Sequence, residues 1–271
     1  MDGYSKFLNL LPTLKTPIEY QLQFDKECVP LEVGKKINIA WEGKIACVSC
    51  GRQIKKSFQN GHCYVCFTQK ASCDLCILKP ELCHYHLGTC REPDWGLSHC
   101  FQDHIVYLAN TTGLKVGITR LTNMPRRWID QGAIQACPLL VCSNRRVSGL
   151  IEVHLAKNMS DKTKWQQLIK SSTESIDMAL YHEQWTGYLK QTIDSISIDP
   201  SDIHWVDFKE HRFTYPIDAY SNKAKSLKLI PNEPLSEVIR GIKGQYLIFD
   251  YGALNLRNLQ GYFLNIDLPG H

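Results

Sequence analysis

Residues 47–66 read CVSCGRQIKKSFQNGHCYVC, and this stretch decides the organisation of the N-terminal half of the chain. It holds two CxxC pairs separated by twelve residues, and Gly51 follows the first pair directly. Each pair brings two thiolates within reach of one ion, and together they complete the tetrahedron of a structural zinc site. Gly51 provides a tight turn in which backbone amides can approach the sulfur atoms. The stretch therefore predicts a zinc ribbon with the ligands Cys47, Cys50, Cys63 and Cys66.

The remaining cysteines predict a second metal. Of the 12 cysteines in the chain, ten lie between Cys28 and Cys100, and residues 73–104 alone hold nine cysteine or histidine ligands. This exceeds what one tetrahedral site uses. The predicted ligands of a second zinc are Cys76, Cys83, Cys90 and Cys100, and an iron–sulfur cluster is the alternative that four thiolates permit.

Three cysteines and one histidine can be explained as core residues without a metal. His104 either replaces one of these cysteines or is a core histidine. Cys28, Cys137 and Cys142 lie outside the cysteine-rich block, and we expect them to be buried as small hydrophobic side chains.

Composition and charge limit the class of protein. The formal net charge is +4 and hydrophobic residues make up 44% of the chain, values that permit a nucleic-acid partner without requiring one. No run of eighteen apolar residues is present, so we expect no membrane-spanning helix. The first residues show no export signal, and we therefore expect a cytoplasmic protein. In that reducing compartment, clustered cysteines hold metal more often than they form disulfides.

Changes in pattern along the chain predict an α+β protein with four regions. Alternating strands and the zinc-binding block come first, and a compact unit of strands and helices follows. A helical and β region completes the chain, and we expect it to pack back on the N-terminal strands. The predicted boundaries are 1–45, 46–104, 105–165 and 166–271.

The third region begins with a predicted β-hairpin. Ile105–Ala109 and Leu114–Thr119 have strand patterns, and Asn-Thr-Thr-Gly between them is typical of a turn. A short helix is expected next, capped by Asn123 and ended by Gly132. A second helix is predicted around Glu152, which stands among apolar residues.

This third region resembles the GIY-YIG endonuclease superfamily, especially its short, phage-type members. Val106-Tyr107-Leu108 corresponds to the first strand motif, and Lys115-Val116-Gly117-Ile118-Thr119 corresponds to the second. Arg127 lies in the following helix and Glu152 in the next one, as the family pattern requires. The resemblance covers about sixty of the 271 residues.

The resemblance implies metal-assisted cleavage of a phosphodiester. Tyr107 would orient or deprotonate the attacking water, and Arg127 would stabilise charge on the scissile phosphate. Glu152 would hold Mg²⁺ or Mn²⁺. Gln131, one turn after Arg127, would face the same side.

One residue departs from the superfamily pattern. Lys115 occupies the position of the second tyrosine, and a lysine can pair with phosphate but is a poor general base unless it is buried. The simpler alternative is that Tyr107 is a core tyrosine and Glu152 an ordinary helical glutamate.

The whole chain is also similar to an uncharacterised bacterial family of zinc-containing proteins. The stretches that carry this likeness are 88–93, 115–120, 127–133 and 241–247.

Basic clusters beside aromatic residues predict a nucleic-acid partner, either RNA or a structured DNA. The predicted contact residues are Lys55, Lys56, Arg120, Arg126 and Trp128. Two alternatives stay open: a non-catalytic adaptor that uses the zinc sites as a scaffold for a protein partner, and an RNA-modification protein.

Overall fold

The computed structural model describes residues 1–5, 8–159 and 164–269. Its contacts separate the chain into two units. Unit 1 comprises residues 1–68, 165–172 and 213–271, and unit 2 comprises residues 69–164 and 173–212. Both units mix helices with antiparallel strands, which confirms the α+β class. The predicted zinc-binding region contributes to both units, and the four-region division stays a prediction.

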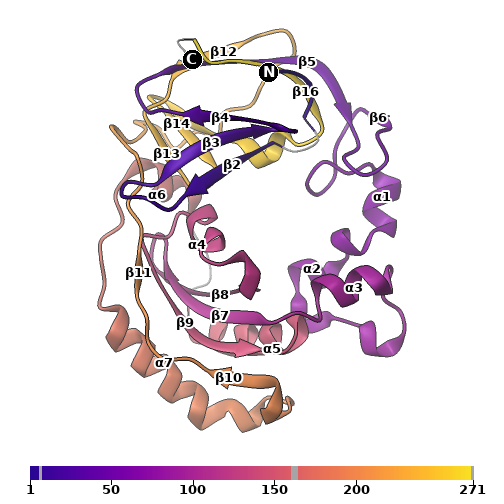
Figure 1. Ribbon diagram of the computed structural model, residues 1–271, viewed down its shortest axis with the longest axis vertical. Coiled ribbons are helices and arrows are strands. Elements are labelled where there is room, and N and C mark those ends of the chain that lie inside the picture. The colour runs from indigo at the N-terminus through magenta and orange to yellow at the C-terminus, as the bar shows by residue number, and fades with distance from the viewer. Residues whose placement is uncertain (6–7, 160–163, 270–271) are drawn as a thin grey trace. The chain divides into compact units, whose positions relative to one another are not determined.

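The largest sheet of unit 1 joins strands from both ends of the chain (Figure 1). The long strand β5 (Lys36–Ala46) pairs with β16 (Tyr262–Asp267) on one side and β12 (Leu235–Val238) on the other. β1 (Asp2–Tyr4) extends the sheet beyond β16, and β6 (Gln53–Ile54) pairs with the end of β5. The C-terminal strands therefore pack on the N-terminal ones, as predicted.

Two three-stranded sheets and short helices complete unit 1. Its remaining elements are β2 (Leu8–Thr13), β3 (Glu19–Phe24), β4 (Glu27–Leu31), α6 (Trp165–Lys170), β13 (Gly241–Lys243), β14 (Tyr246–Phe249) and β15 (Gly252–Asn255). Helix α1 (Tyr64–Gln69) begins inside the second CxxC pair and ends at the boundary with unit 2.

The sheet of unit 2 is built around β7 (His104–Asn110), in which every residue is buried. β7 lies between β8 (Leu114–Arg120) and β9 (Gln135–Cys142), and β9 also pairs with β10 (Ile203–Trp205) and β11 (His211–Arg212). The hairpin register is regular and places Tyr107 opposite Gly117. The predicted hairpin is therefore present.

Helices cover both faces of this sheet (Figure 1). Because side chains alternate along a strand, Val106 and Leu108 face one way and pack with α5 (Arg145–Ala156) and α7 (Met178–Thr192). Tyr107 faces the other way and meets Trp128 of α4 (Arg126–Asp130). The sheet thus separates an apolar core from the face that carries Tyr107.

Short helices connect the two CxxC pairs of the ribbon to β7. α2 (Leu75–Leu78), α3 (Pro93–His99) and several 3₁₀ turns form this part of unit 2. None of the helices in the described ranges is both long and apolar enough to cross a membrane.

Two local predictions are wrong. Asn123 does not cap α4, because its side chain donates to Thr119 and Pro125 occupies the N-cap position without a side-chain bond. Cys137 and Cys142 are buried as expected, but Cys28 is exposed because it lies on β4 with its side chain toward solvent.

Candidate functional site

The four ribbon cysteines come together at the end of β5. Their sulfur atoms all lie within 4.8 Å of one another, and Cys50 Sγ is 3.8 Å from Cys63 Sγ. A zinc ion with Zn–S bonds of about 2.3 Å gives sulfur–sulfur distances of about 3.8 Å in a tetrahedron. The four side chains therefore have the spacing that a metal such as zinc requires.

Local surroundings shift the pKa values of two ribbon thiols in opposite directions. The Cys66 N–H donates to Cys63 Sγ at 3.4 Å, and Gly51, with φ +73°, donates its N–H to the Cys47 carbonyl at 2.8 Å. Burial acts to raise the pKa of Cys47, but backbone N–H groups of Cys50 and Cys63 outweigh it and lower that pKa to about 6. Burial raises the pKa of Cys66 to about 12. A divalent cation would allow all four thiols to ionise together.

Tyr107 lies across Gly117 in the neighbouring strand. A Cβ added at Gly117 would be 2.7 Å from both Cζ and Oη of Tyr107, closer than real Cβ contacts allow. The Tyr107 side chain is 0% exposed, and its ring meets the edge of Trp128 at a centroid distance of 5.8 Å. The glycine of the second strand motif therefore makes room for the tyrosine of the first.

Gly117→Ala is expected to displace the Tyr107 ring and to lower the free energy of unfolding of unit 2 by about 1–3 kcal/mol, as overpacking does. Urea unfolding measures this change. The control is Gly187→Ala in α7, where no described atom beyond the chain neighbours and the helix's own backbone lies within 4 Å of the added Cβ. That change is expected to be neutral or to stabilise the helix by up to about 1 kcal/mol. Equal effects of the two substitutions would contradict the packing of Tyr107 on Gly117.

Gln131 joins Tyr107 to Arg127. Its side-chain amide lies 3.0 Å from Tyr107 Oη. With the amide oxygen turned toward the guanidinium, it accepts from Arg127 Nη2 at 3.2 Å and Nε at 3.3 Å, while the amide nitrogen donates to Tyr107. Burial raises the pKa of Tyr107 above its ordinary value, so the phenol stays neutral. This geometry suits Tyr107 to holding Gln131 and Arg127 in place.

Glu152 is a half-buried carboxylate among positive charges. Burial raises its pKa to about 7, and the charges of Arg145, Arg127 and Lys115 act in the opposite direction. Glu81 adds a negative charge close enough to raise this pKa further. A half-buried carboxylate oxygen is a ligand suited to a hard cation such as Mg²⁺.

Glu152→Gln is expected to stabilise the metal-free protein, and more so as the pH rises. The folded state holds a proton on Glu152 up to about pH 7, whereas the unfolded state releases it near its ordinary pKa. The folded state therefore binds more protons between these values, and the wild-type free energy of unfolding falls as the pH rises through this window. The glutamine variant loses that penalty, about 1–3 kcal/mol at about pH 8 and almost none at about pH 4.

Urea unfolding at these two pH values, without added Mg²⁺, measures the effect. Glu183→Gln, at an exposed position of α7, is the control and is expected to change neither value. A pH-independent difference between wild type and Glu152→Gln would show that the carboxylate is not held in a costly environment.

The residues predicted to contact nucleic acid differ in their exposure to solvent. Lys55 and Lys56 are exposed in the ribbon of unit 1, and Arg126 is exposed on α4, where its Nε lies 3.8 Å from Asp130. Arg120 is half-buried at the end of β8. Trp128 is only 2% exposed and packs on Tyr107, so it presents no face on which a base could stack.

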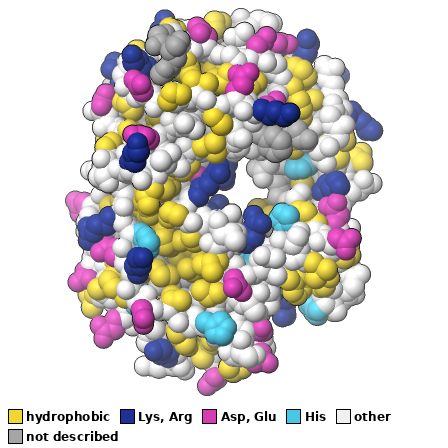
Figure 2. Space-filling model, viewed as in Figure 1, with side chains coloured by type: hydrophobic (Ala, Val, Ile, Leu, Met, Phe, Trp, Pro, Cys, Tyr) yellow, Lys and Arg dark blue, Asp and Glu magenta, His cyan; other side chains and the backbone are white. Residues whose placement is uncertain are grey.

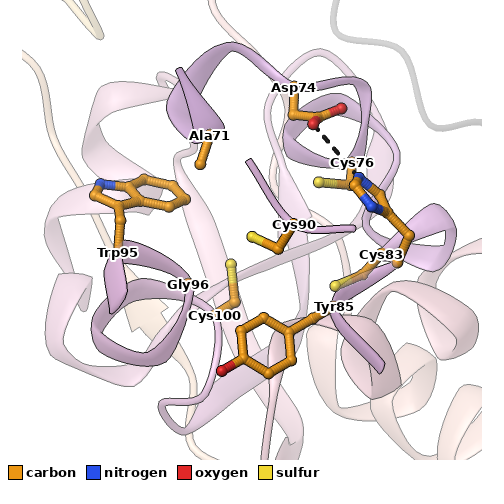
Figure 3. Close-up of a pocket in the computed structure, with 10 residues that line it drawn as sticks. Ala71, Asp74, Cys76, Cys83, Tyr85, Cys90, Trp95, Gly96 and Cys100 are labelled. Atoms are coloured by element: carbon orange, nitrogen blue, oxygen red, sulfur yellow. Dashed lines mark ion pairs between the residues drawn. The ribbon is translucent and has the colours of Figure 1, made fainter. Parts of the chain in front are cut away.

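The second set of predicted ligands lines a pocket in unit 2. Cys76, Cys83, Cys90 and Cys100 all border this pocket (Figure 3). The three ligand atoms that lie within 4.8 Å of one another belong to Asp74, Cys76 and His84. His104 lies outside the pocket lining and is fully buried, with Nδ1 2.6 Å from the Gln102 carbonyl, which matches the core-histidine reading.

Two residues of the site, Arg145 and Glu81, were not among the predicted site residues. Arg145 and Glu81 both act on the charge of Glu152. Arg145 is the first residue of α5, two turns before Glu152, so helical spacing could have pointed to it. Glu81 comes from the cysteine-rich segment, and only the tertiary fold brings it to α5.

The family comparison covers both candidate sites. A family model described as "Protein of unknown function (DUF2797)" matches residues 34–264. The chain belongs to this family. The match confirms the prediction of a family of unknown function, and its description includes neither zinc nor cleavage. No curated protein and no solved structure matches the chain. The residues of this DUF2797 member are therefore the guide to its function.

Charge on the molecular surface is mixed. Figure 2 shows lysine and arginine side chains interspersed with aspartate and glutamate on the visible face of the molecule. A broad basic field is the usual electrostatic mark of non-specific nucleic-acid binding. The mixed charge of this face is therefore not such a broad basic field.

Proposed function

We propose that this protein is a zinc-containing, nucleic-acid-binding phosphodiesterase whose reactive centre lies in unit 2. The observation that carries the proposal is the convergence of Tyr107, Gln131, Arg127 and Glu152 from a hairpin and two helices. These residue types supply a phosphate-binding cation and a carboxylate for a hard metal, the two components that phosphodiester cleavage needs.

Arg127 would bind the scissile phosphate. A guanidinium can donate to two phosphate oxygens at once, and it stabilises the charge that grows on them in the transition state. The Gln131 amide oxygen holds this guanidinium through two bonds, and Tyr107 holds Gln131. Tyr107 would then be a positioning residue, because its side chain is fully buried and its phenol stays protonated.

Glu152 would hold the catalytic cation. When bound, Mg²⁺ or Mn²⁺ would neutralise phosphate charge and lower the pKa of a bound water. Binding would also give the half-buried carboxylate a directly coordinated cation, in addition to the charges of Arg145, Arg127 and Lys115 that already act on it. Lys115, at the position of the missing second tyrosine, would contact phosphate as a point charge.

The zinc ribbon would have a separate, structural role. A closed site of four cysteines leaves no open coordination position for substrate. Lys55 and Lys56 are exposed on the same ribbon, which would let it contribute phosphate contacts while the zinc holds its shape. The proposed partner is RNA or a structured DNA.

The test is a binding and cleavage assay on tRNA, single-stranded RNA, and single- and double-stranded DNA at low salt. Wild type, Tyr107→Phe and Glu152→Ala are compared with and without Mg²⁺ or Mn²⁺. Metal-dependent cleavage by wild type, loss of cleavage in Glu152→Ala and a lowered kcat in Tyr107→Phe would support the proposal. Salt-sensitive binding without cleavage would overturn the catalytic part. Absence of binding would overturn both parts and favour a protein-binding adaptor.

A further inference from the structure

A second group of cysteines surrounds a pocket on the side of unit 2 that carries α2 and α3. The sulfur atoms of Cys76, Cys83, Cys90 and Cys100 face the interior of this pocket (Figure 3). The free space between them is about 10 Å³, roughly what one water-sized particle needs. The four cysteines come from separate turns, so only the fold brings them together.

The other metal-binding groups at this pocket are already engaged. Asp74 Oδ1 accepts from the Leu75 N–H at 2.6 Å, and Asp74 Oδ2 pairs with Arg91 Nε at 2.8 Å. His84 Nε2 lies 3.4 Å from the same carboxylate, and His84 Nδ1 lies 2.7 Å from Thr89 Oγ1. Asp74 and His84 are therefore occupied by hydrogen bonds and ion pairs at the edge of the pocket. The thiols of Cys76, Cys83, Cys90 and Cys100 are left as its potential metal ligands.

The segment around the pocket has little apolar core to hold it together. Six of its apolar side chains are exposed to solvent: Leu75, Leu78, Leu82, Leu87, Leu97 and Phe101. Its regular structure consists of α2, α3 and three-residue 3₁₀ turns. Segments of this kind usually depend on a bound metal or a disulfide to keep one conformation.

We propose that Cys76, Cys83, Cys90 and Cys100 bind a second zinc ion, and that this ion holds helix α5, and with it Glu152, in place. Four thiolates facing one small space are the ligand set of a structural zinc site. The zinc site itself stands independently of the proposed function, and its importance for Glu152 rests on that function.

Three contacts couple this pocket to α5. The Arg145 backbone N–H donates to the Cys100 carbonyl at 2.8 Å, and Arg145 Nη2 donates to the Ile77 carbonyl at 2.6 Å. Gly149 packs against the loop between Cys76 and Cys83, since a Cβ there would lie 2.5 Å from Pro80 Cβ. The first two turns of α5 thus contact the segments that carry the pocket cysteines. Glu152 lies less than one turn after Gly149.

The metal content of purified full-length protein tests the site. Wild type is expected to hold two zinc ions per chain, and the double variant Cys83→Ser/Cys90→Ser is expected to hold one. Cys28→Ser changes an exposed cysteine outside both clusters and is expected to keep two. One zinc in wild type, or two in the double variant, would overturn the proposal. Iron with visible absorption in wild type would also overturn it, in favour of an iron–sulfur cluster.

X-ray absorption at the zinc edge tests the ligand set in the wild-type protein. It therefore does not depend on whether the cysteine variants fold. Two four-cysteine sites are expected to give an average of four sulfur ligands per zinc. Nitrogen or oxygen ligands in that average would overturn the ligand set in favour of one that includes Asp74 or His84.

Amide hydrogen exchange tests the coupling without an activity assay. In Cys83→Ser/Cys90→Ser, exchange within α5 is expected to speed up by at least about tenfold, while exchange within α7 stays near its wild-type rate. Unchanged protection of α5 would overturn the coupling. Because none of these three measurements uses substrate, failure here is distinguishable from failure of the phosphodiesterase proposal.

Discussion

A Cys63→Ser variant is expected to lose one zinc ion per chain and to leave residues 47–66 without a stable conformation. Cys63 is buried, and its sulfur lies 3.8 Å from that of Cys50 and accepts the Cys66 N–H. Structural zinc contributes about 10–16 kcal/mol of apparent binding free energy in small zinc modules. This exceeds what the ribbon can obtain from its own apolar contacts, because among the described residues its buried cluster consists of three cysteines, with the partly buried Ile54 packed against it.

Zinc analysis and hydrogen exchange over residues 47–66 measure this effect. The serine substitution at exposed Cys28 is the control and is expected to keep the zinc and the protection of the ribbon. Slow exchange in the ribbon of Cys63→Ser would mean that the fold there does not depend on metal.

Arg127→Lys is expected to lower the rate of cleavage by about 10²–10³-fold while the protein stays folded. The guanidinium of Arg127 is held by the Gln131 amide oxygen at two nitrogen atoms, at 3.2 and 3.3 Å. A lysine keeps the charge but lacks the planar guanidinium. It therefore cannot donate two hydrogen bonds to the Gln131 oxygen, and it cannot bind two phosphate oxygens in the same way.

Arg126→Lys is the matched control, because Arg126 is exposed on the same helix and its contact is a 3.8 Å ion pair with Asp130. Its expected effect is a change in kcat of less than about threefold, since exposed ion pairs contribute little. Single-turnover rates on the substrate selected by the cleavage panel make the comparison. Similar losses in the two variants would assign Arg127 only a general electrostatic role.

Local sequence patterns predict much of unit 2. The turn at Asn110–Gly113 and the apolar runs on either side specify the hairpin, because strand propensity and turn chemistry are properties of neighbouring residues. The helix around Glu152 follows in the same way from its apolar spacing. The doubled CxxC of the ribbon predicts a site that the structure assembles.

Contacts between distant segments could not be predicted from local pattern. The bond from Arg145 to the Ile77 carbonyl and the charge of Glu81 near Glu152 join α5 to a segment about seventy residues earlier. Neither contact has a characteristic spacing, because Ile77 acts through its backbone and Glu81 lies in a 3₁₀ turn. Trp128 was expected at the surface beside two arginines, but the face of α4 that packs on Tyr107 buries it.

Lys115, at the position of the second tyrosine of the GIY-YIG pattern, adds a positive charge to the site. Lys115 and Arg127 both act on Glu152, and burial nevertheless keeps the pKa of that carboxyl at about 7. The site thus holds the carboxyl groups of Glu152 and Glu81 against at least three cations, an arrangement suited to a polyanionic ligand that brings its own counter-cation.

The most direct test of the phosphodiesterase proposal is single-turnover cleavage by wild type, Glu152→Gln and the exposed control Glu183→Gln in saturating Mg²⁺. The amide keeps the shape of Glu152 but removes the negative charge that would hold the cation. We expect wild type and Glu183→Gln to cleave at the same rate, and Glu152→Gln to be slower by at least about 10³-fold. Cleavage by Glu152→Gln at the wild-type rate, or cleavage by wild type that needs no divalent metal, would contradict the proposal.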